Sequence, residues 1–359
     1  MKLRHWATLG GATLGAIGLG LAIKSFLPSP LVRGERTGRT AGDHKGPPSR
    51  SSPPSPLRTA KTLSKERISE RRDEEGILRS QYPEIEVTFL RCGSVTIPEC
   101  IAVRGASPFA TCVIAYSAVL IRHPKATFLY DTGLCNDIYL YLIDQSWFFR
   151  KTLANFVFER SLAGHLQHIG LRPGDIDFAL ISHLHWDHVS GIPDIPGVPL
   201  RVNRVEYDAA RLGLLDAFHG LVRQLLWDNP LEFFDCTNTS YEGFSSSYDV
   251  FGDGSVVLVP LPGHTAGNTG MFINRSNGSR LFLLGDAAWV SQNYLRPATM
   301  HPLIWLPLTS DDATARRTLL QLHHFSQQRP DISLIAMHDA KMQEQFMAIE
   351  NPGVAAMPH

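Results

Sequence analysis

The chain has 359 residues, of which 43% are hydrophobic, and 34 basic side chains balance 34 acidic ones. This is ample for a sizeable core, and the length allows one to three domains. The balance is uneven, because residues 1–75 carry 14 Lys/Arg but 7 Asp/Glu. Since that basic excess falls in a segment without the pattern of a fold, we expect no nucleic-acid partner.

Residues 1–27 are predicted to form a hydrophobic helix that acts as a membrane anchor or signal segment. Basic residues precede an uncharged run from Trp6 to Ile23, which Lys24 ends. Eighteen residues is the short end of a transmembrane span, and the layout also fits a signal peptide. No clean small-x-small cleavage site follows, so we favour an uncleaved anchor over a signal peptide or a buried soluble helix. The chain is then membrane-anchored or exported, with its orientation left open.

The rest of the chain divides into a linker, a domain and a tail. Residues 28–75 are rich in Pro, Ser and Arg and are predicted to be a disordered linker, because they cannot bury enough apolar area to offset their ordering entropy. Residues 76–345 form the predicted globular domain, and residues 346–359 a C-terminal tail.

Apolar runs within the domain predict strands, and longer amphipathic stretches predict helices. A helical spacing is also found across residues 137–169. The predicted strands cover 85–90, 112–121, 127–130, 176–181, 199–202, 256–261, 271–273, 281–284 and 333–337, with helices at 206–227 and 312–328. Strands that come first as a meander and later alternate with helices suggest two sheets with helices packed outside.

The densest chemical motif is Ser182-His183-Leu184-His185-Trp186-Asp187-His188, directly after a predicted strand. At a strand end, His183 and His185 point to the same side. If the chain turns after Trp186, Asp187 and His188 lie beside them. Imidazole and carboxylate are the ligands that Zn²⁺ and similar divalent ions prefer. A surface histidine cluster is the alternative, and this spacing after a strand argues against it.

Three more polar residues follow apolar runs in the same way. His264, Asp286 and His338 each come at the end of a predicted strand. A single such residue is usually a hydrogen-bonding or capping group. Because strand ends from one sheet edge can converge on one mouth, four such endings together predict a shared site.

These residues resemble the motifs of the metallo-β-lactamase superfamily. The resemblance covers about residues 85–345 and is carried by His183 to His188, Pro262-Gly263-His264-Thr265-Ala266-Gly267, Leu284-Gly285-Asp286, Met337-His338-Asp339 and Asp131-Thr132-Gly133. It implies an α/β (α+β) fold, a four-layer αββα sandwich with a two-metal site between the sheets.

The resemblance also assigns the ligands. His183, His185 and His264 would hold one metal, Asp187, His188 and His338 the other, and Asp286 would bridge both. Asp131 would support the metal-bound histidines. Two zinc ions, or other divalent metals such as Fe, Mn or Co, would yield a bridging hydroxide that attacks a carbonyl. Asp187 is the candidate catalytic residue that hands a proton to the leaving group.

Within the superfamily the chain is most similar to the lactonases that open N-acyl homoserine lactones. Those enzymes carry a Tyr three residues after the bridging Asp, where this chain has Trp289. The indole N–H can donate a hydrogen bond, but it is bulkier and placed differently. Trp289 is therefore either a substrate contact or a wall of the pocket, and Tyr294 is a second nearby candidate.

Three functions remain open at this stage. The first is a dinuclear hydrolase of a lactone or another ester, acting on a small-molecule substrate. The second is a hydrolase of the same fold acting on a thioester, β-lactam, phosphodiester or sulfate ester. The third is a redox protein of the flavodiiron type, which needs a flavin partner.

Overall fold

The computed structural model describes residues 71–72, 78–79, 81–211, 216–226 and 228–350. The chain divides into two units, residues 1–67 and 68–359, and the fold below belongs to the second unit. The predicted anchor (1–27) and most of the predicted linker lie outside the described residues. Among the residues that are described, none of the helices has the length and apolar character needed to cross a membrane.

The end of the predicted linker departs from our expectation. Strand β1 (Arg71–Arg72) pairs antiparallel with β2 (Leu78–Arg79). The prediction of an unstructured segment up to residue 75 therefore does not hold for these two residues.

The first sheet has seven strands in the order β6-β3-β4-β5-β7-β8-β9. Its first four strands in space are antiparallel, and β5, β7, β8 and β9 run parallel. The strands are β3 (Glu86–Pro98), β4 (Thr111–His123), β5 (Ala126–Thr132), β6 (Val157–Phe158), β7 (Phe178–Ile181), β8 (Leu200–Asn203) and β9 (Leu231–Phe234).

The second sheet has five strands in the order β10-β11-β12-β13-β14. Only β13 and β14 are parallel, and the segment that joins them holds three α-helices between residues 291 and 328. The strands are β10 (Tyr248–Asp249), β11 (Val256–Pro260), β12 (Thr269–Asn274), β13 (Arg280–Leu283) and β14 (Ile332–Ile335). The expectation of a mixed α/β fold with two sheets is thus confirmed.

The two sheets pack face to face, because one buried cluster draws side chains from both. Val119, Ile121 and Phe128 of the first sheet share this cluster with Leu258 and Met271 of the second. Alternate residues of the same strands face outward, as the period of two in a strand requires. Each sheet therefore has an outer face that helices must cover.

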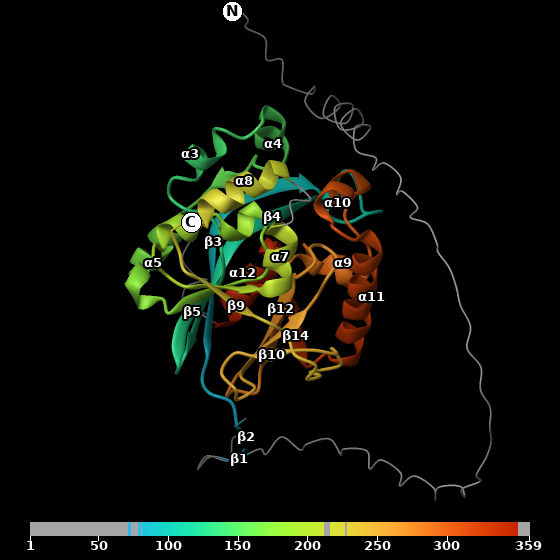
Figure 1. The fold of residues 1–359 in the computed structure, drawn as a ribbon. Helices are drawn as coiled ribbons and strands as arrows, with labels where there is room; N and C mark the ends of the chain where they lie inside the picture. The colour runs from blue at the N-terminus through green and yellow to red at the C-terminus, as the bar shows by residue number, and fades with distance from the viewer. Residues whose placement is uncertain (1–70, 73–77, 80, 212–215, 227, 351–359) are drawn as a thin grey trace, which may run out of the picture. The chain divides into compact units, whose positions relative to one another are not determined.

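Helices cover both outer faces, so the layers run helix, sheet, sheet, helix. Side chains of α3, α4, α5, α6 and α8 pack on the first sheet, and those of α9 and α11 pack on the second. Figure 1 shows α5 on one side of the strands and α11 on the opposite side. The helices are α2 (Glu99–Ala102), α3 (Ile138–Leu142), α4 (Trp147–Thr152), α5 (Leu162–His168), α6 (Trp186–Val189), α7 (Arg204–Arg211), α8 (Asp216–Leu225), α9 (Ser291–Leu295), α10 (Pro302–Leu308), α11 (Asp312–Gln328) and α12 (Ala340–Glu350).

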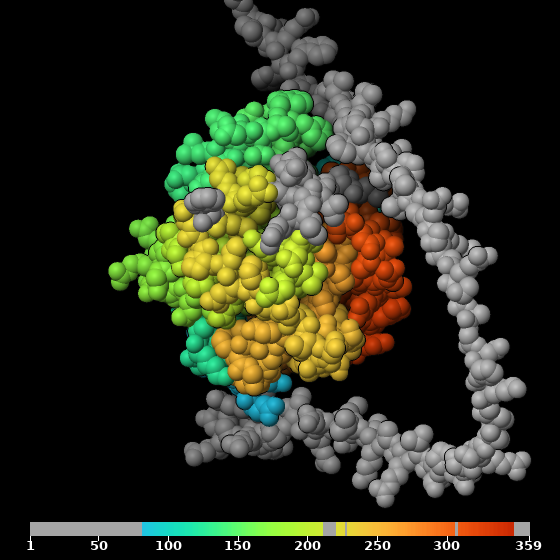
Figure 2. Space-filling view, viewed as in Figure 1, coloured from blue at the N-terminus to red at the C-terminus, as the bar shows by residue number. Residues whose placement is uncertain are grey.

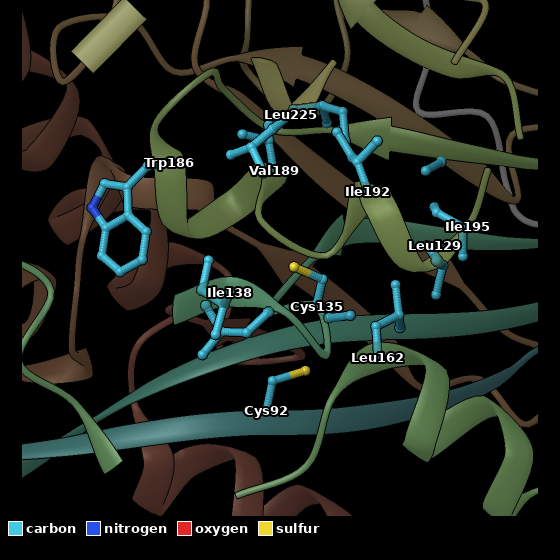
Figure 3. Packing of buried hydrophobic residues seen from close by; sticks show 14 of the residues in the cluster. Cys92, Leu129, Cys135, Ile138, Leu162, Trp186, Val189, Ile192, Ile195 and Leu225 are labelled. Atoms are coloured by element: carbon cyan, nitrogen blue, oxygen red, sulfur yellow. The ribbon is translucent and has the colours of Figure 1, made fainter. Parts of the chain in front are cut away.

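The cluster on the first sheet is mainly aliphatic, with Trp186 at one edge. Figure 3 shows the free thiols Cys92 and Cys135 among aliphatic side chains such as Ile138 and Leu162. Burial raises the pKa of both thiols to about 12, so they pack as small apolar groups. On the face seen in Figure 2, the orange-red residues, which come late in the sequence, lie along the right-hand side.

Two boundaries differ from the predictions. Residues 137–169 hold three short helices and strand β6, because Ser146 and Ser161 cap new helix starts by accepting from Phe149 N and Gly164 N. The domain does not end at residue 345, since α12 continues to Glu350. Phe346, which we predicted to lie in the tail, is buried edge-to-face on Phe89, with the ring centroids 5.6 Å apart.

Candidate metal centre

Every predicted metal ligand follows a strand end, and the structure brings these ends together. Strand β7 ends at Ile181, and His183 and His185 lie in the turn before α6, which carries Asp187 and His188. His264 follows β11, Asp286 lies in a 3₁₀ turn after β13, and His338 follows β14. Residues up to 155 positions apart in sequence thereby meet between the two sheets.

The first group of ligand atoms comprises His183, His185, His264 and Asp286. One ligand atom from each lies within 4.8 Å of the others. Nε2 of His264 is 2.9 Å from Nδ1 of His185 and 3.3 Å from Oδ2 of Asp286. Three imidazoles and one carboxylate that converge in this way match the donor set of a zinc-type site.

The second group comprises Asp187, His188 and His338, again within 4.8 Å. Nε2 of His338 lies 3.5 Å from Oδ2 of Asp187, and Nε2 of His188 lies 3.8 Å from the same atom. Oδ1 of Asp286 is 3.2 Å from both of these imidazole nitrogens. Oδ2 of Asp286 lies 3.3 Å from Nε2 of His264 in the first group and 3.3 Å from Nε2 of His338 in the second, so this carboxylate lies between the two groups.

Asp131 supports the second group through a contact with His188. Its Oδ2 lies 2.8 Å from Nδ1 of His188, while Oδ1 accepts from the backbone N–H of Ser182 at 2.8 Å. Asp131 has a positive φ of 55°, which is uncommon for a residue other than Gly. The backbone adopts this conformation at the end of β5, where the fully buried carboxylate reaches the ligand.

Ser182 connects the two groups. Its hydroxyl donates to Oδ2 of Asp131 at 2.8 Å and lies 3.0 Å from Nδ1 of His183. Both histidines therefore have their non-ligand nitrogen held, which fixes the ring orientation and leaves Nε2 for a metal. This role of Ser182 was not predicted from the sequence.

Glu206 was also missed as a support for the site. From α7 it accepts from Leu184 N at 2.8 Å and from Gly267 N at 2.9 Å. These two backbone positions flank the loops that carry His183 and His264. The sequence signal was the stretch Arg204-Val205-Glu206-Tyr207 after a buried strand, which resembles the lactonases, and no local pattern shows which loops Glu206 reaches.

Trp289 contacts a ligand directly. Its indole N–H donates to Oδ2 of Asp286 at 2.9 Å, and its ring centroid is 5.4 Å from that of His338. The prediction left a choice between a substrate contact and a pocket wall, and the structure places the donor on the carboxylate between the two groups.

Tyr294 lies elsewhere, contrary to the prediction. Its hydroxyl donates to the carbonyl of Leu334 at 3.1 Å inside the cluster under α11. Helix α9 turns the chain away from the ligands after Val290, so closeness in sequence to Asp286 does not bring Tyr294 to the site.

His338 is held by the neighbouring sheet. Its Nδ1 lies 2.7 Å from the carbonyl of Ala115, and its own carbonyl accepts from Ala115 N at 3.0 Å. This pair joins β4 of the first sheet to the end of β14 in the second.

The imidazoles divide by charge state. Burial lowers the pKa of His183 well below its ordinary value and that of His264 to about 3, so both are neutral. Burial opposes the proton on His188 and His338 as well, but the charges of Asp286 and Asp187, joined by Asp131 at His188, together outweigh it and raise both pKa values. In return, despite burial, these two histidines lower the pKa of Asp286.

The buried polar atoms fit a pair of bound cations. Nε2 of His183, Nε2 of His188 and Oδ1 of Asp286 are buried and have no hydrogen-bond partner among the described residues. Buried polar groups are rarely left without a partner, so these atoms call for a ligand. All three face the centre of the two groups, as metal-binding atoms would.

The sequence profile of the Metallo-beta-lactamase superfamily matches residues 113–329. The chain therefore belongs to this superfamily, as predicted.

Individual relatives are N-acyl homoserine lactonases. The chain is 27% identical over 165 residues to N-acyl homoserine lactonase AttM of Rhizobium radiobacter, which covers 45% of this chain and 55% of the relative. It is 26% identical over 136 residues to N-acyl homoserine lactonase AiiA of Bacillus thuringiensis subsp. kurstaki, covering 38% and 48%. The chain thus spans about half the length of the curated relatives that it matches.

Solved structures share the fold. An N-acyl homoserine lactone hydrolase with N-hexanoyl-L-homoserine bound at its catalytic metal centre matches with a TM-score of 0.57 at 18% identity, covering 74% of this chain and 97% of that one. A quorum-quenching N-acyl homoserine lactone lactonase matches with a TM-score of 0.56, also at 18% identity, covering 74% and 96%.

Proposed function

We propose that this chain is a dinuclear metal-dependent hydrolase that opens lactones, with N-acyl homoserine lactones as the substrate class to test first. The observation that carries the proposal is the Asp286 carboxylate, which lies between two groups of candidate ligands and contacts imidazoles of both. The similarity to named lactonases supports the choice of substrate.

His183, His185 and His264 would hold one ion, and Asp187, His188 and His338 the other, with Asp286 shared. We propose zinc as the native metal, because imidazole and carboxylate ligands suit it. When bound, such ions lower the pKa of water toward ~7 and polarise a carbonyl oxygen. Around them, Asp131 and Ser182 hold the orientation of two ligand rings, and Trp289 holds the carboxylate.

Asp187 is the proposed proton donor to the leaving oxygen. Its side chain is 14% exposed, whereas that of Asp286 is 2% exposed, so Asp187 is the carboxylate that a substrate can reach. Opening a lactone converts the ring oxygen into an alcohol, which needs a proton. The carboxylate of Asp187 would take the proton that the attacking water or hydroxide loses and pass it to the leaving oxygen within hydrogen-bond reach.

The test is metal analysis of the purified full chain joined to a hydrolysis screen. We expect about two zinc ions per chain and faster turnover of lactones than of thioesters, β-lactams or phosphodiesters. His183→Ala and His264→Ala should each lose metal and activity together. Full activity in both variants contradicts the assignment, and a preference for another bond would keep the metal centre but replace the substrate class.

We further propose that residues 1–27 anchor the enzyme to a membrane or direct its export. Support comes only from the uncharged run Trp6–Ile23 and its basic flanks. Fractionation of cells that express the full chain, compared with a chain lacking residues 2–27, tests it. Recovery of the full chain entirely in the soluble fraction of the cytoplasm would contradict the proposal.

A further inference from the structure

Tyr116 stands out among the buried tyrosines because its hydroxyl is unused. Tyr130 donates to the carbonyl of Thr269 at 2.6 Å, and Tyr294 donates to that of Leu334. The side chain of Tyr116 is 7% exposed, and within the described part of the chain its hydroxyl makes no hydrogen bond. The hydroxyl is not among the fully buried polar atoms that lack a partner, so water or a ligand can reach it.

The surroundings of Tyr116 place it beside the second ligand group. Its ring meets the ring of His338 edge-on with the centroids 5.9 Å apart. On its other side lie the rings of Trp186, at 5.8 Å, and Phe156, at 5.5 Å. Trp186 immediately precedes Asp187 on α6, and Ala115, next to Tyr116 on β4, holds His338 through its backbone.

The carboxylates that affect the pKa of Tyr116 also belong to the neighbourhood of the second ligand group. After burial, the carboxylates of Asp187 and Asp286 are the causes that raise the pKa of Tyr116. Both belong to the metal centre. The ring of Tyr116, packed against the rings of His338, Trp186 and Phe156, thus lies next to the second ligand group.

The other donor near this position is already engaged. The indole N–H of Trp289 binds Oδ2 of Asp286. A bound ester has two oxygens that gain charge during the reaction. Its carbonyl oxygen has the metal ions as electrophiles, whereas its ring oxygen, which leaves as an alcohol, needs a hydrogen-bond donor.

We propose that the Tyr116 hydroxyl donates a hydrogen bond to the leaving oxygen of the substrate, next to Asp187. This inference rests on the proposed lactone hydrolysis. Tyr116 itself neither gains nor loses a proton in this role, because Asp187 supplies the proton to the leaving oxygen. The tyrosine stabilises negative charge on that oxygen as the carbon–oxygen bond breaks.

The experiment compares the full chain with Tyr116→Phe and with Tyr139→Phe as the matched control. Tyr139 belongs to the same aromatic cluster, stacking on Phe156 at 5.7 Å, but it is 54% exposed. Each protein is loaded with zinc and assayed with an acyl homoserine lactone and the corresponding thiolactone, whose ring sulfur accepts hydrogen bonds poorly. The affinity for the ring-opened hydroxy acid is measured by calorimetry.

We expect Tyr116→Phe to lose about tenfold or more in kcat/KM on the lactone, much less on the thiolactone, and to bind the hydroxy acid more weakly. Tyr139→Phe should match the wild type throughout. The lactone-to-thiolactone ratio does not depend on how much of the variant is folded or loaded.

An unchanged ratio in Tyr116→Phe overturns the role of Tyr116 while leaving the proposed function intact. A clear drop in the thermal midpoint or metal content of this variant also overturns it, because it would show that the hydroxyl serves the fold. If the wild type itself opens no lactone, the proposed function and this inference fail together.

Discussion

The indole nitrogen of Trp289 lies 2.9 Å from Oδ2 of Asp286, the carboxylate that faces both groups of ligands. We expect Trp289→Phe to keep an aromatic ring beside His338 but to lose this hydrogen bond. Loss of a partner behind a metal ligand costs about 10- to 100-fold in metal affinity or activity. Competition with a coloured chelator measures the affinity. Trp147→Phe, at a 68% exposed site on α4, is the control and should show no change.

Asp131 makes a second, more selective prediction. Asp131→Asn keeps an acceptor for Ser182 N but removes the charge beside Nδ1 of His188. Since His188 belongs to the second group, we expect that metal to be weakened by about 10- to 100-fold and the first metal much less. Metal analysis after dialysis should then find close to one ion per chain. Asp177→Asn alters a carboxylate that accepts from Thr127 N away from the centre and should retain both ions.

The raised pKa values of His188 and His338 predict that loading the second group releases protons. Below these raised pKa values the two rings hold protons that compete with a cation, so metal affinity should increase as pH rises through them. Calorimetric titration of zinc into the metal-free chain in two buffers of different ionisation heat measures the release. A heat that is identical in both buffers at neutral pH would contradict the prediction.

Gly267 predicts a packing constraint on the loop that carries His264. A Cβ at this position would lie 2.6 Å from both Cα and Cβ of Glu206, closer than real contacts allow. Gly267→Ala should therefore push α7 away, with a loss of about 1–3 kcal/mol of unfolding free energy and reduced metal content. Gly174→Ala, where a Cβ meets nothing within 4 Å, is the control. Denaturant unfolding of the two variants decides the point.

The convergence of the candidate ligands could be predicted from sequence because each one follows a buried apolar run and the edges of two packed sheets bring such ends together. Helix α11 was also predictable, since its amphipathic pattern begins at Asp311, which caps it by accepting from Thr314 N. A long amphipathic pattern with its own N-cap predicts a helix reliably, because tertiary contacts seldom override so many consistent local preferences.

The supporting residues could not be predicted in the same way. Asp131 was assigned only by resemblance, and the reach of Glu206 to two loops depends on how α7 sits on the sheet. Tyr116 looked like one more apolar position in a strand, and Tyr294 looked close to Asp286. Side-chain direction after a turn is set by packing, which sequence spacing does not encode.

The paired hydrogen bonds between Ala115 and His338 have a consequence for unfolding. His338 follows a strand of the second sheet but bonds to the backbone of the first. Cations held by the second group would therefore link the two sheets to each other. Amide hydrogen exchange in β4 and β14 should then slow by a similar factor when zinc is added. The two sheets should also unfold in a single cooperative transition and not in two separate ones.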